Sequence, residues 1–307
     1  MSRTHADRCP GVLRPWIADD GAIVRLRLVG GALTSQMLTD LMGIAAQWAD
    51  GTVLLTKRAN LQLRGIDHTR QDDGTSCVPA EFVEAITTAG FLPAPTHELV
   101  RNIMVSPLSG RVGGRADLFP VARQLDEALC AEPLLAGLSA RFLFVLDDGR
   151  GDLVDRSLDL GAMAVDAENA QLRIGSHGWG EVIELDAVAE VLLDLATRFV
   201  RARGSDPGAP WHIDELREPG GTARGHDGSG PWGIAEMHHA RDLRTQVTSP
   251  FPPRGKLTQN DGRTAEIVEV PDGVLTHDLA TQVLAQAGRD LIVTPWRSVV
   301  LPDLAEE

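Results

Sequence analysis

The sequence is short of the residues that would place it in several common protein classes. Of its 307 residues only three are cysteine, Cys9, Cys77 and Cys130, and no two of them form a C-x-x-C pair. Neither a disulfide framework nor a cysteine-based metal site is therefore predicted, and a reducing compartment is expected. No apolar run approaches the roughly 20 residues of a membrane span, and residues 1–11 lack the apolar core of a signal peptide. We expect a soluble, cytoplasmic protein.

Basic residues are also in the minority, with 29 Lys and Arg against 43 Asp and Glu and a net charge of −14. A molecule with this charge repels nucleic acid and anionic membranes, so neither is expected as a partner. An anionic ligand would need a local basic cluster. The stretch 54–65, "LLTKRANLQLRG", supplies one, because Lys57, Arg58 and Arg64 stand close together with Asn60 and Gln62 between them.

An alternating pattern just upstream predicts a strand that carries further basic residues. In "AIVRLRL" (22–28), Val24, Leu26 and Leu28 fall on one face, and Arg25 and Arg27 fall on the other. We therefore expect a half-buried strand whose open face is basic.

The surrounding pattern predicts a small layered domain. Thr34 or Ser35 can cap a helix that ends at Gly51, strands are predicted at 52–56 and 61–65, and a second helix is predicted at 79–89. The resulting β-α-β-β-α order favours helices on one face of a sheet, which leaves the other face for a ligand.

The rest of the chain predicts a middle region followed by a repeat of the first. A strand is expected at 141–147 and a helix at 185–203, while 204–232 is dense in Gly, Pro and Asp and is typical of an exposed linker. Beyond it, "PDGVLT" (271–276), a helix at 277–287 and "LIVTPWRSVVLPDL" (291–304) parallel the first region. The interval from the capping Thr to the next strand-end Thr is 22 residues in the first copy and 18 in the second, a difference of about one helical turn.

We predict an α+β fold with two ferredoxin-like half-domains, at 1–95 and 221–307, related by a pseudo-two-fold repeat. A central α/β domain at 96–220 separates them.

Six polar residues of the first region are predicted to share the open face of its strands. Two readings fit: a solvated basic face, or a site that binds carboxylates or oxyanions through planar Arg groups. Several guanidinium groups on one face repel one another unless an anion, an acidic neighbour or solvent compensates, which favours the second reading. These residues are Arg25, Arg27, Lys57, Arg58, Gln62 and Arg64.

Other candidate motifs give weaker evidence for a function. Arg101 and Asn102 precede a turn at Ser106-Pro107 and read either as a loop anchor or as ligand contacts. The adjacent His238 and His239 diverge on a helix or a strand, so no shared metal is predicted. The tripeptide RGD at 150–152 is attributed to chance.

Four segments of the chain carry a family resemblance. They are "CPGVLRP" (9–15), "TKRANLQLRG" (56–65), "RNIMVSPLSG" (101–110) and "TPWRSVVLPDL" (294–304). In this order and spacing they resemble the siroheme-dependent nitrite and sulfite reductase superfamily, and within it the precorrin-3B synthase branch of cobalamin biosynthesis. The resemblance covers nearly the whole chain and implies a tetrapyrrole site at the junction of the two repeats.

The resemblance also implies roles for individual residues. Arg58, Gln62, Arg64, Arg101 and Asn102 fall where the family contacts the carboxylates of the macrocycle or a bound anion. Arg141 falls near a basic active-site position of the reductases, whereas Leu143 stands where a second basic residue is expected. Arg297 is the counterpart of the basic turn in the second repeat. The candidate tetrapyrrole-binding residues are Arg25, Arg27, Lys57, Arg58, Asn60, Gln62, Arg64, Arg101, Asn102, Arg141 and Arg297; no catalytic or metal-binding residue is assigned.

The implied activity is the oxidation of precorrin-3A with dioxygen, which hydroxylates the ring and closes a γ-lactone. The family uses a 4Fe-4S cluster and iron, with siroheme in the reductases, and its cluster is held by four cysteines after the second half-domain. This chain stops at Glu307 and its cysteines do not match that pattern, so the cluster is not expected here.

Three alternatives stay open at this point. One is a non-catalytic tetrapyrrole-binding or scaffold protein. Another is the cluster-less half of a split enzyme, whose partner would be a separate cluster-bearing polypeptide. The third is a siroheme nitrite or sulfite reductase, which Leu143 and the missing cysteines disfavour. In each case the expected ligand is a precorrin or a siroheme-like tetrapyrrole.

Overall fold

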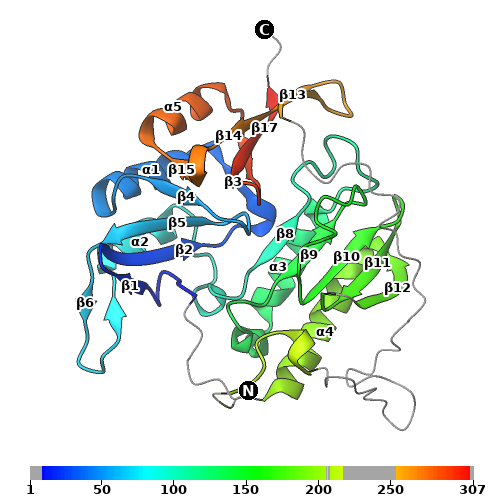
Figure 1. Cartoon of the computed structure of the whole chain (residues 1–307), viewed down its shortest axis with the longest axis horizontal. Coiled ribbons are helices and arrows are strands. Elements are labelled where there is room, and N and C mark those ends of the chain that lie inside the picture. Colours follow the sequence, from blue (N-terminus) through cyan, green and yellow to red (C-terminus); the bar gives the residue numbers. More distant parts are fainter. Residues whose placement is uncertain (1–8, 177, 205, 207, 217–253, 305–307) are drawn as a thin grey trace. The chain divides into compact units, whose positions relative to one another are not determined.

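The computed structural model describes residues 9–176, 178–204, 206, 208–216 and 254–304. They divide into two compact units, each described by itself (Figure 1). The repeat unit comprises residues 9–101 and 254–304, and the central unit comprises residues 102–216. None of the described helices combines the length and the apolar character needed to cross a bilayer.

The repeat unit contains two five-stranded antiparallel sheets that exchange one strand each. The first sheet has the order β1 (Trp16–Ala18), β2 (Gly21–Leu26), β5 (Leu61–Ile66), β4 (Val53–Leu55) and β15 (Val274–Leu275). The second has the order β13 (Gly255–Thr258), β14 (Thr264–Glu269), β17 (Ser298–Leu304), β16 (Asp290–Val293) and β3 (Ala32–Thr34). Thus β15, from the second repeat, completes the first sheet, and β3, from the first repeat, completes the second.

Two glycines allow the chain to cross between the sheets. Gly31 and Gly273 precede the exchanged strands and have positive φ angles of 77° and 76°. A Cβ on Gly31 would lie 2.0 Å from the carbonyl oxygen of Val293, and a Cβ on Gly273 would lie 3.0 Å from that of Leu55. Each glycine therefore lies against the strand of the other repeat, and the two crossings are equivalent.

Helices of the two repeats begin with the same cap. The Thr34 hydroxyl accepts a hydrogen bond from the Met37 amide at the start of α1 (Ser35–Trp48), and Thr276 does the same for Leu279 at the start of α5 (His277–Gln286). Helix α1 has 14 residues and α5 has 10, which accounts for the shorter spacing of the second repeat. The predicted repeat is confirmed.

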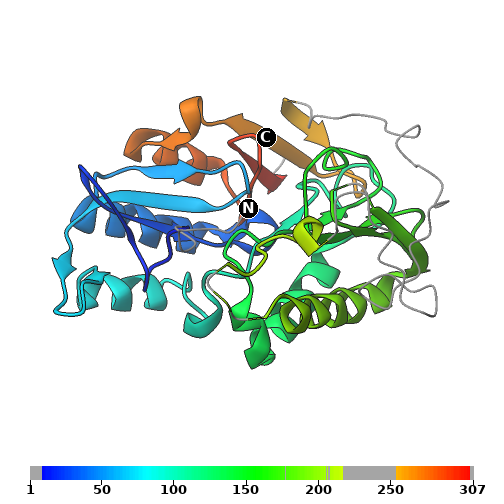
Figure 2. The ribbon, with the colours of Figure 1, turned by 60° about the horizontal axis from the view of Figure 1, so that its bottom comes forward.

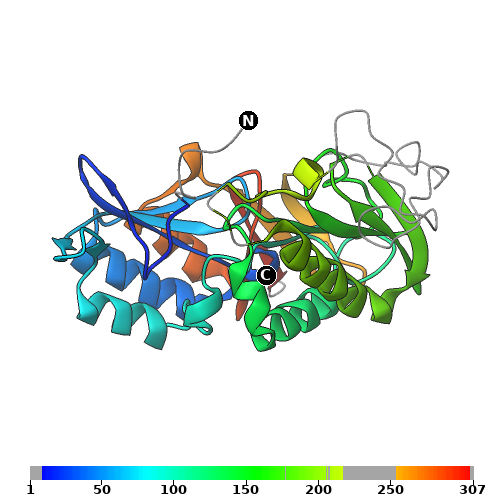
Figure 3. The same cartoon turned by 90° about the horizontal axis from the view of Figure 1, so that it is seen from below.

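One hydrophobic core holds the repeat unit together. It gathers buried side chains from both sheets, from α1 and α5, and from α2 (Ala80–Thr88). Leu61 and Leu63 of β5 and Val24 of β2 point into it, as the alternating pattern predicts. Figure 3 shows α1 and α2 on the same side of the first sheet, so the remaining residues of these strands face the opposite side. A short hairpin, β6 (Thr69–Arg70) and β7 (Ser76–Cys77), lies between β5 and α2.

The central unit is a mixed five-stranded sheet with two helices on one side (Figure 2). Its order is β12 (Gly178–Glu184), β11 (Asn169–Ile174), β10 (Leu160–Ala164), β9 (Phe144–Asp147) and β8 (Ile103–Val105). Strands β8, β9 and β10 run parallel, and β10, β11 and β12 run antiparallel. Helices α3 (Phe119–Ala131) and α4 (Val188–Arg203) pack against each other and the sheet. The α+β prediction is confirmed.

The linker prediction for 204–232 is partly wrong. Ala209 and Ile213 are 5% and 2% exposed, and the Ile213 amide donates to the buried Asp159 carboxylate at 2.8 Å. Residues 209–216 therefore pack on the central unit, because their two apolar side chains and this hydrogen bond anchor them. Residues 217–232, the boundary near 220, and His238 and His239 lie outside the described residues. The three-domain boundaries stay a prediction.

Candidate functional site

The basic turn between β4 and β5 is built around one threonine. The Thr56 hydroxyl accepts hydrogen bonds from the amides of Asn60, at 3.1 Å, and Arg58, at 3.4 Å, while the Thr56 amide donates to the Asn60 carbonyl. Ala59 takes a left-handed conformation with φ 55°. The turn leaves Lys57 exposed and Arg58 half-buried, so both basic side chains reach the surface from a rigid backbone.

The second repeat has the same turn with different side chains. The Thr294 hydroxyl accepts from the amides of Trp296 and Ser298, both at 3.2 Å, and Arg297 has φ 61°. Arg297 therefore occupies the position of Ala59, and Trp296 occupies that of Arg58. The Arg297 side chain packs on Gly273, and its Nη1 donates to the Asp272 carbonyl at 3.2 Å. Arg297 thus lies in the turn that corresponds to the basic turn of the first repeat, and its side chain packs where the chain crosses between the sheets at Gly273.

The open face of the first sheet changes from polar to aliphatic side chains between β2 and β15. Arg25 of β2 pairs in register with Gln62 of β5, and its Nη2 donates to the Gln62 Oε1 at 3.3 Å. Gln62 pairs in turn with Leu54 of β4, which pairs with Val274 of β15. The face is therefore basic at β2 and half-buried and aliphatic toward β15.

Arg64 already has an acidic neighbour on this face. Its Nε donates to the Asp20 carboxylate at 2.6 Å, and the two side chains are 40% and 45% exposed. The pairing lowers the pKa of Asp20 and raises that of Arg64. Exposed pairs of this kind contribute little to stability, so Arg64 can exchange this partner for a ligand at small cost.

Arg27 does not lie on the open face, contrary to the sequence prediction. Strand β2 ends at Leu26, and Arg27 is 4% exposed with its Nη1 donating to the Pro10 carbonyl at 3.2 Å. Burial lowers the pKa of Arg27 to about 10, and the charges of Arg25 and Arg58 act in the same direction. Glu98 and Cys9 oppose this shift. Residues 9–10, far away in the sequence, cover the guanidinium, which a strand pattern does not reveal.

The charges of Arg25 and Arg58 thus both act on the Arg27 guanidinium. The Nε atom of Arg25 is buried and makes no hydrogen bond within the described part of the chain. Arg25 and Arg58 both raise the positive potential at Arg27. An anion bound near these three guanidinium groups would therefore be stabilised electrostatically. We call Arg25, Arg27 and Arg58 the guanidinium cluster.

The remaining predicted residues have other contacts in the structure. Asn60 is 1% exposed and its Oδ1 accepts from the Leu28 amide at 3.0 Å, so its side chain braces the turn. Arg101 is buried at the end of the repeat unit. Asn102 and Arg141 belong to the central unit, where the Asn102 Nδ2 donates to the Ala140 carbonyl and Arg141 stacks on Trp211 at 5.0 Å.

The central unit also contains an ionic cluster that the sequence reasoning missed. The Asp147 carboxylate accepts from the amides of Gly149, Gly151 and Leu153, and so shapes the loop after β9. Arg150 donates to both oxygens of Asp148 and to the Val112 carbonyl. The repeated Asp and Gly in "DDGRGD" (147–152) was the signal, and its RGD is therefore a buried structural element.

Asp152 is the third carboxylate of this cluster. It accepts from the Ser106 hydroxyl at 2.6 Å, and burial, reinforced by the charge of Asp147, raises its pKa to about 7. Oxygens of the three aspartates lie within 4.8 Å of one another, a spacing that a cation could bridge. Arg150 already pairs with Asp148 and Asp152, so the carboxylates of this cluster have a cationic partner within the fold.

The three cysteines are divided between the two units. Cys9 and Cys77 lie in the repeat unit and Cys130 lies in α3 of the central unit, and none of the three forms a disulfide. Three cysteines cannot supply the four thiolates of a cubane cluster. The residues of this chain therefore do not fit an iron-sulfur cluster by themselves.

Comparisons with known proteins identify part of the repeat unit. Residues 18–73 match the family described as "Nitrite/Sulfite reductase ferredoxin-like half domain". This segment carries β2, α1, β4, β5 and the basic turn, so the match covers most of the proposed site.

Two curated proteins resemble the chain over limited stretches. A precorrin-3B synthase of Sinorhizobium sp. is 31% identical over 142 residues, which cover 46% of this chain and 28% of that protein. The sulfite reductase (NADPH) hemoprotein beta-component of Methylobacterium sp. (strain 4-46) is 23% identical over 107 residues, 35% of this chain and 17% of that protein. The matched stretch is less than a third of either relative.

One solved structure matches nearly the whole chain. The NirA protein of Mycobacterium tuberculosis superposes with a TM-score of 0.68, covering 99% of this chain and 58% of that one, at 18% identity. At this identity the likeness shows the fold.

Proposed function

We propose, from the chain's membership of the nitrite and sulfite reductase superfamily, that its repeat unit binds the carboxylates of a tetrapyrrole of the precorrin class. The protein is precorrin-3B synthase-like, and its proposed place is in tetrapyrrole-related redox chemistry. The finer assignment, the oxidation of precorrin-3A in cobalamin biosynthesis, rests on the resemblance.

The guanidinium cluster is the observation that supports this proposal. Arg27 is buried beside two further positive charges that lower its pKa, and Arg25 keeps a buried Nε without an acceptor among the described residues. An arriving carboxylate would offset the repulsion and accept from this Nε. Charge-assisted hydrogen bonds of this kind are the strong ones in proteins.

The open face of the first sheet suits the rest of such a ligand. A precorrin has an apolar ring and a periphery of carboxylate side chains. Leu54 and Val274 offer aliphatic contact, and Lys57, Gln62 and Arg64 offer polar groups within the same unit. In this proposal Gln62 orients Arg25, and Asn60 holds the turn that carries Arg58.

Three further predicted residues, Arg101, Asn102 and Arg141, stay proposed ligand contacts on the resemblance alone. Asn102 and Arg141 are proposed to contact the ligand, as the resemblance implies, with Trp211 holding the Arg141 guanidinium in place. Arg101 is the corresponding residue of the repeat unit.

In the proposed reaction this chain binds and orients precorrin-3A and keeps its carboxylates charged. Iron, when bound, would supply the oxygen chemistry that hydroxylates the ring before an acetate side chain closes the lactone. The described thiols do not fit a 4Fe-4S cluster, so no step is assigned to one.

A non-catalytic tetrapyrrole-binding protein is the second candidate, and the cysteine count favours it. In its split-enzyme form, a separate polypeptide would supply the cluster. A siroheme reductase is less well supported, because Leu143 is an apolar residue, 5% exposed, where the resemblance expects a basic group.

The test is a titration of the purified chain, kept anaerobic, with precorrin-3A and with siroheme, followed by absorbance of the macrocycle. We expect a saturable spectral shift that weakens roughly tenfold or more in Arg25→Gln and in Arg58→Gln, because each loses a charge-assisted contact. The matched control is Arg263→Gln in the same unit, whose guanidinium is exposed and pairs with Asp261. It should bind as the unaltered chain does.

Two results would overturn the proposal. The absence of a shift with either tetrapyrrole would reject tetrapyrrole binding altogether. Equal affinity in the unaltered chain and in a double variant of Arg25 and Arg58 would reject this site. A fully methyl-esterified ligand separates the contribution of the ring from that of the carboxylates. It retains the ring but cannot bind the guanidinium cluster as an anion.

A further inference from the structure

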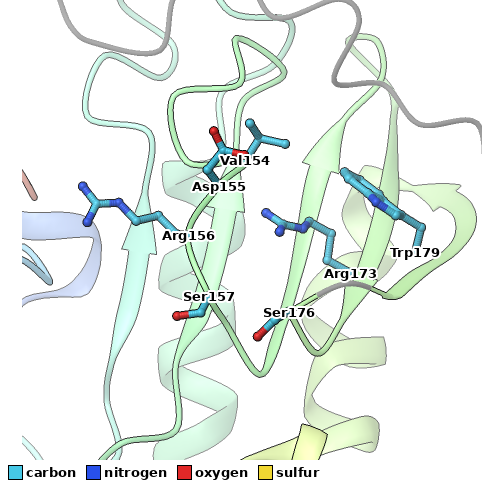
Figure 4. Close-up of a pocket in the computed structure, with 7 residues that line it drawn as sticks. All are labelled: Val154, Asp155, Arg156, Ser157, Arg173, Ser176 and Trp179. Atoms are coloured by element: carbon cyan, nitrogen blue, oxygen red, sulfur yellow. The ribbon is translucent and has the colours of Figure 1, made fainter. Parts of the chain in front are cut away.

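The central unit has a pocket that none of the roles above uses. It has a volume of about 140 Å³ and lies between the loop after Asp152 and the hairpin of β11 and β12 (Figure 4). From the loop it is lined by Arg156 and Ser157, and from the hairpin by Arg173, Ser176 and Trp179. Val154 and Asp155 complete its wall. The exposed Asp155 and Ser157 place its mouth at the surface.

Arg173 is the central cation of this pocket. It projects from β11 and is only 4% exposed, and Figure 4 shows it extending toward the loop, with the Trp179 ring beside it. Its guanidinium carbon lies 5.1 Å from the centre of that ring, and its Nη1 donates to the Leu153 carbonyl over a long 3.4 Å. A stacked and buried Arg keeps a fixed orientation, so its donors are directed before a ligand arrives.

Arg156 lines the other edge of the pocket, and its guanidinium group points outward from the loop. Figure 4 shows Arg156 on the loop, extending away from Arg173, so the two groups do not form one fork. Burial lowers the pKa of Arg156, and the nearby Asp152 only partly opposes this shift. Arg156 stays charged at neutral pH, because an Arg pKa begins far above that range.

The hairpin side of the pocket is held in place by its own hydrogen bonds. The Ser176 amide donates to the Asp214 carboxylate at 3.0 Å, and Gly175 has φ 68° with its Cα close to that carboxylate. The turn is thereby fixed and the Ser176 side chain, drawn in Figure 4, borders the pocket from below. The Arg173 guanidinium and the hydroxyls of Ser157 and Ser176 are the donors, Arg156 adds its charge at the edge, and the Trp179 ring and Val154 form an apolar wall.

We propose that this pocket binds a short-chain monocarboxylate, an acid of about the size of propionate. Two guanidinium groups and the Asp155 carboxylate leave the lining residues one net positive charge, which matches a monoanion better than a phosphate dianion. A cavity of this size accommodates about six heavy atoms, so a carboxylate and its aliphatic arm fit and a tetrapyrrole ring does not. The donors receive the carboxylate, and Trp179 and Val154 contact the arm. This proposal does not rest on tetrapyrrole binding by the repeat unit.

The test uses the full chain and three ligands at constant ionic strength: propionate, its neutral isostere propionamide, and inorganic phosphate. Calorimetry and intrinsic fluorescence report binding, since Trp179 lines the pocket. We expect saturable, weak binding of propionate that is tighter than that of phosphate, and no binding of propionamide. Trp179→Phe should remove most of the fluorescence response, which assigns the signal to this pocket.

Variants separate a site from general charge attraction. Arg173→Gln should weaken propionate binding roughly 10-fold or more, and Arg156→Gln and Ser176→Ala should weaken it several-fold. The matched control is Arg198→Gln in the same unit, because Arg198 is 44% exposed on α4 and pairs with Asp194. It should bind propionate normally. If Arg173→Gln does not fold, the two milder variants carry the test.

The proposal is overturned by any of four results. They are the absence of saturable propionate binding, equal binding of propionamide, tighter binding of phosphate, or unchanged affinity in folded Arg156→Gln and Ser176→Ala.

Discussion

Replacing Gly31 by alanine should destabilise the repeat unit far more than an ordinary Gly→Ala change. Gly31 has φ 77°, a conformation that costs a residue with a Cβ about 1–2 kcal/mol. The added Cβ would also lie 2.0 Å from the Val293 carbonyl oxygen and 3.2 Å from the Ala59 Cβ. A backbone oxygen cannot rotate away, so β3 must separate from β16 and give up ladder hydrogen bonds worth about 1 kcal/mol each. We expect a total loss of about 3 kcal/mol or more.

A second glycine isolates the contribution of that contact. Gly51 has φ 81°, nearly the same conformation, and a Cβ there would meet nothing within 4 Å. Gly51→Ala should therefore cost only the conformational term, about 1–2 kcal/mol. Gly43 lies inside α1, also with open space around it, and Gly43→Ala should stabilise the chain by about 0.8–1 kcal/mol.

The assay is urea unfolding at a fixed pH, followed by circular dichroism, for the three variants and the unaltered chain. Hydrogen exchange at residues 290–293 assigns the change to the exchanged strands, because Gly31→Ala should expose the amides of β16 and Gly51→Ala should not. Equal unfolding midpoints for Gly31→Ala and Gly51→Ala, with equal protection of the β16 amides, would refute the argument. The close approach of Gly31 to Val293 would then not be needed to pair β3 with β16.

Two further predictions concern buried and exposed polar contacts. Asn60→Ala removes the acceptor of the buried Leu28 amide and should cost about 1–3 kcal/mol of stability in urea unfolding. Asp20→Asn breaks the exposed pair with Arg64 and should cost at most about 1 kcal/mol. Similar losses in the two variants would contradict this ranking. Asp152 should make stability fall as pH rises from about 4 to 7, because its pKa is raised to about 7 and the folded chain holds a proton there that the unfolded chain has released. Asp152→Asn lacks this titration, so its stability relative to the unaltered chain should improve across that window, and a pH-independent difference would contradict the assignment.

Local patterns were sufficient to predict much of the repeat unit. The capping threonines, the alternation in β2 and β5, and the difference of about one turn between the helices are all read from neighbouring residues, and the structure has them in place. Caps and alternation depend on contacts within a few residues, which a sequence displays directly. The predicted site residues themselves stay predictions, since their roles have not been tested.

Long-range contacts account for what the sequence did not reveal. Alternation placed Arg27 outward, but residues 9–10 fold over it and bury it. The exchanged strands β3 and β15 have three and two residues, too few for a pattern to mark them. The pocket around Arg173 combines a loop and a hairpin whose pairing only the fold defines. In each case the decisive partner is far away along the chain.

Side-chain differences at equivalent positions explain why the proposed site is asymmetric although the fold is a repeat. Both repeats form the same threonine-based turn, between β4 and β5 and between β16 and β17, with matching amide hydrogen bonds to Thr56 and Thr294. The backbone is therefore equivalent at the two positions, and only side chains can distinguish them. The first turn carries Lys57 and Arg58, and the second carries Pro295 and Trp296 at the same positions. Arg58 of the first turn therefore contributes to the guanidinium cluster, whereas Arg297 of the second turn donates to the Asp272 carbonyl and packs on Gly273.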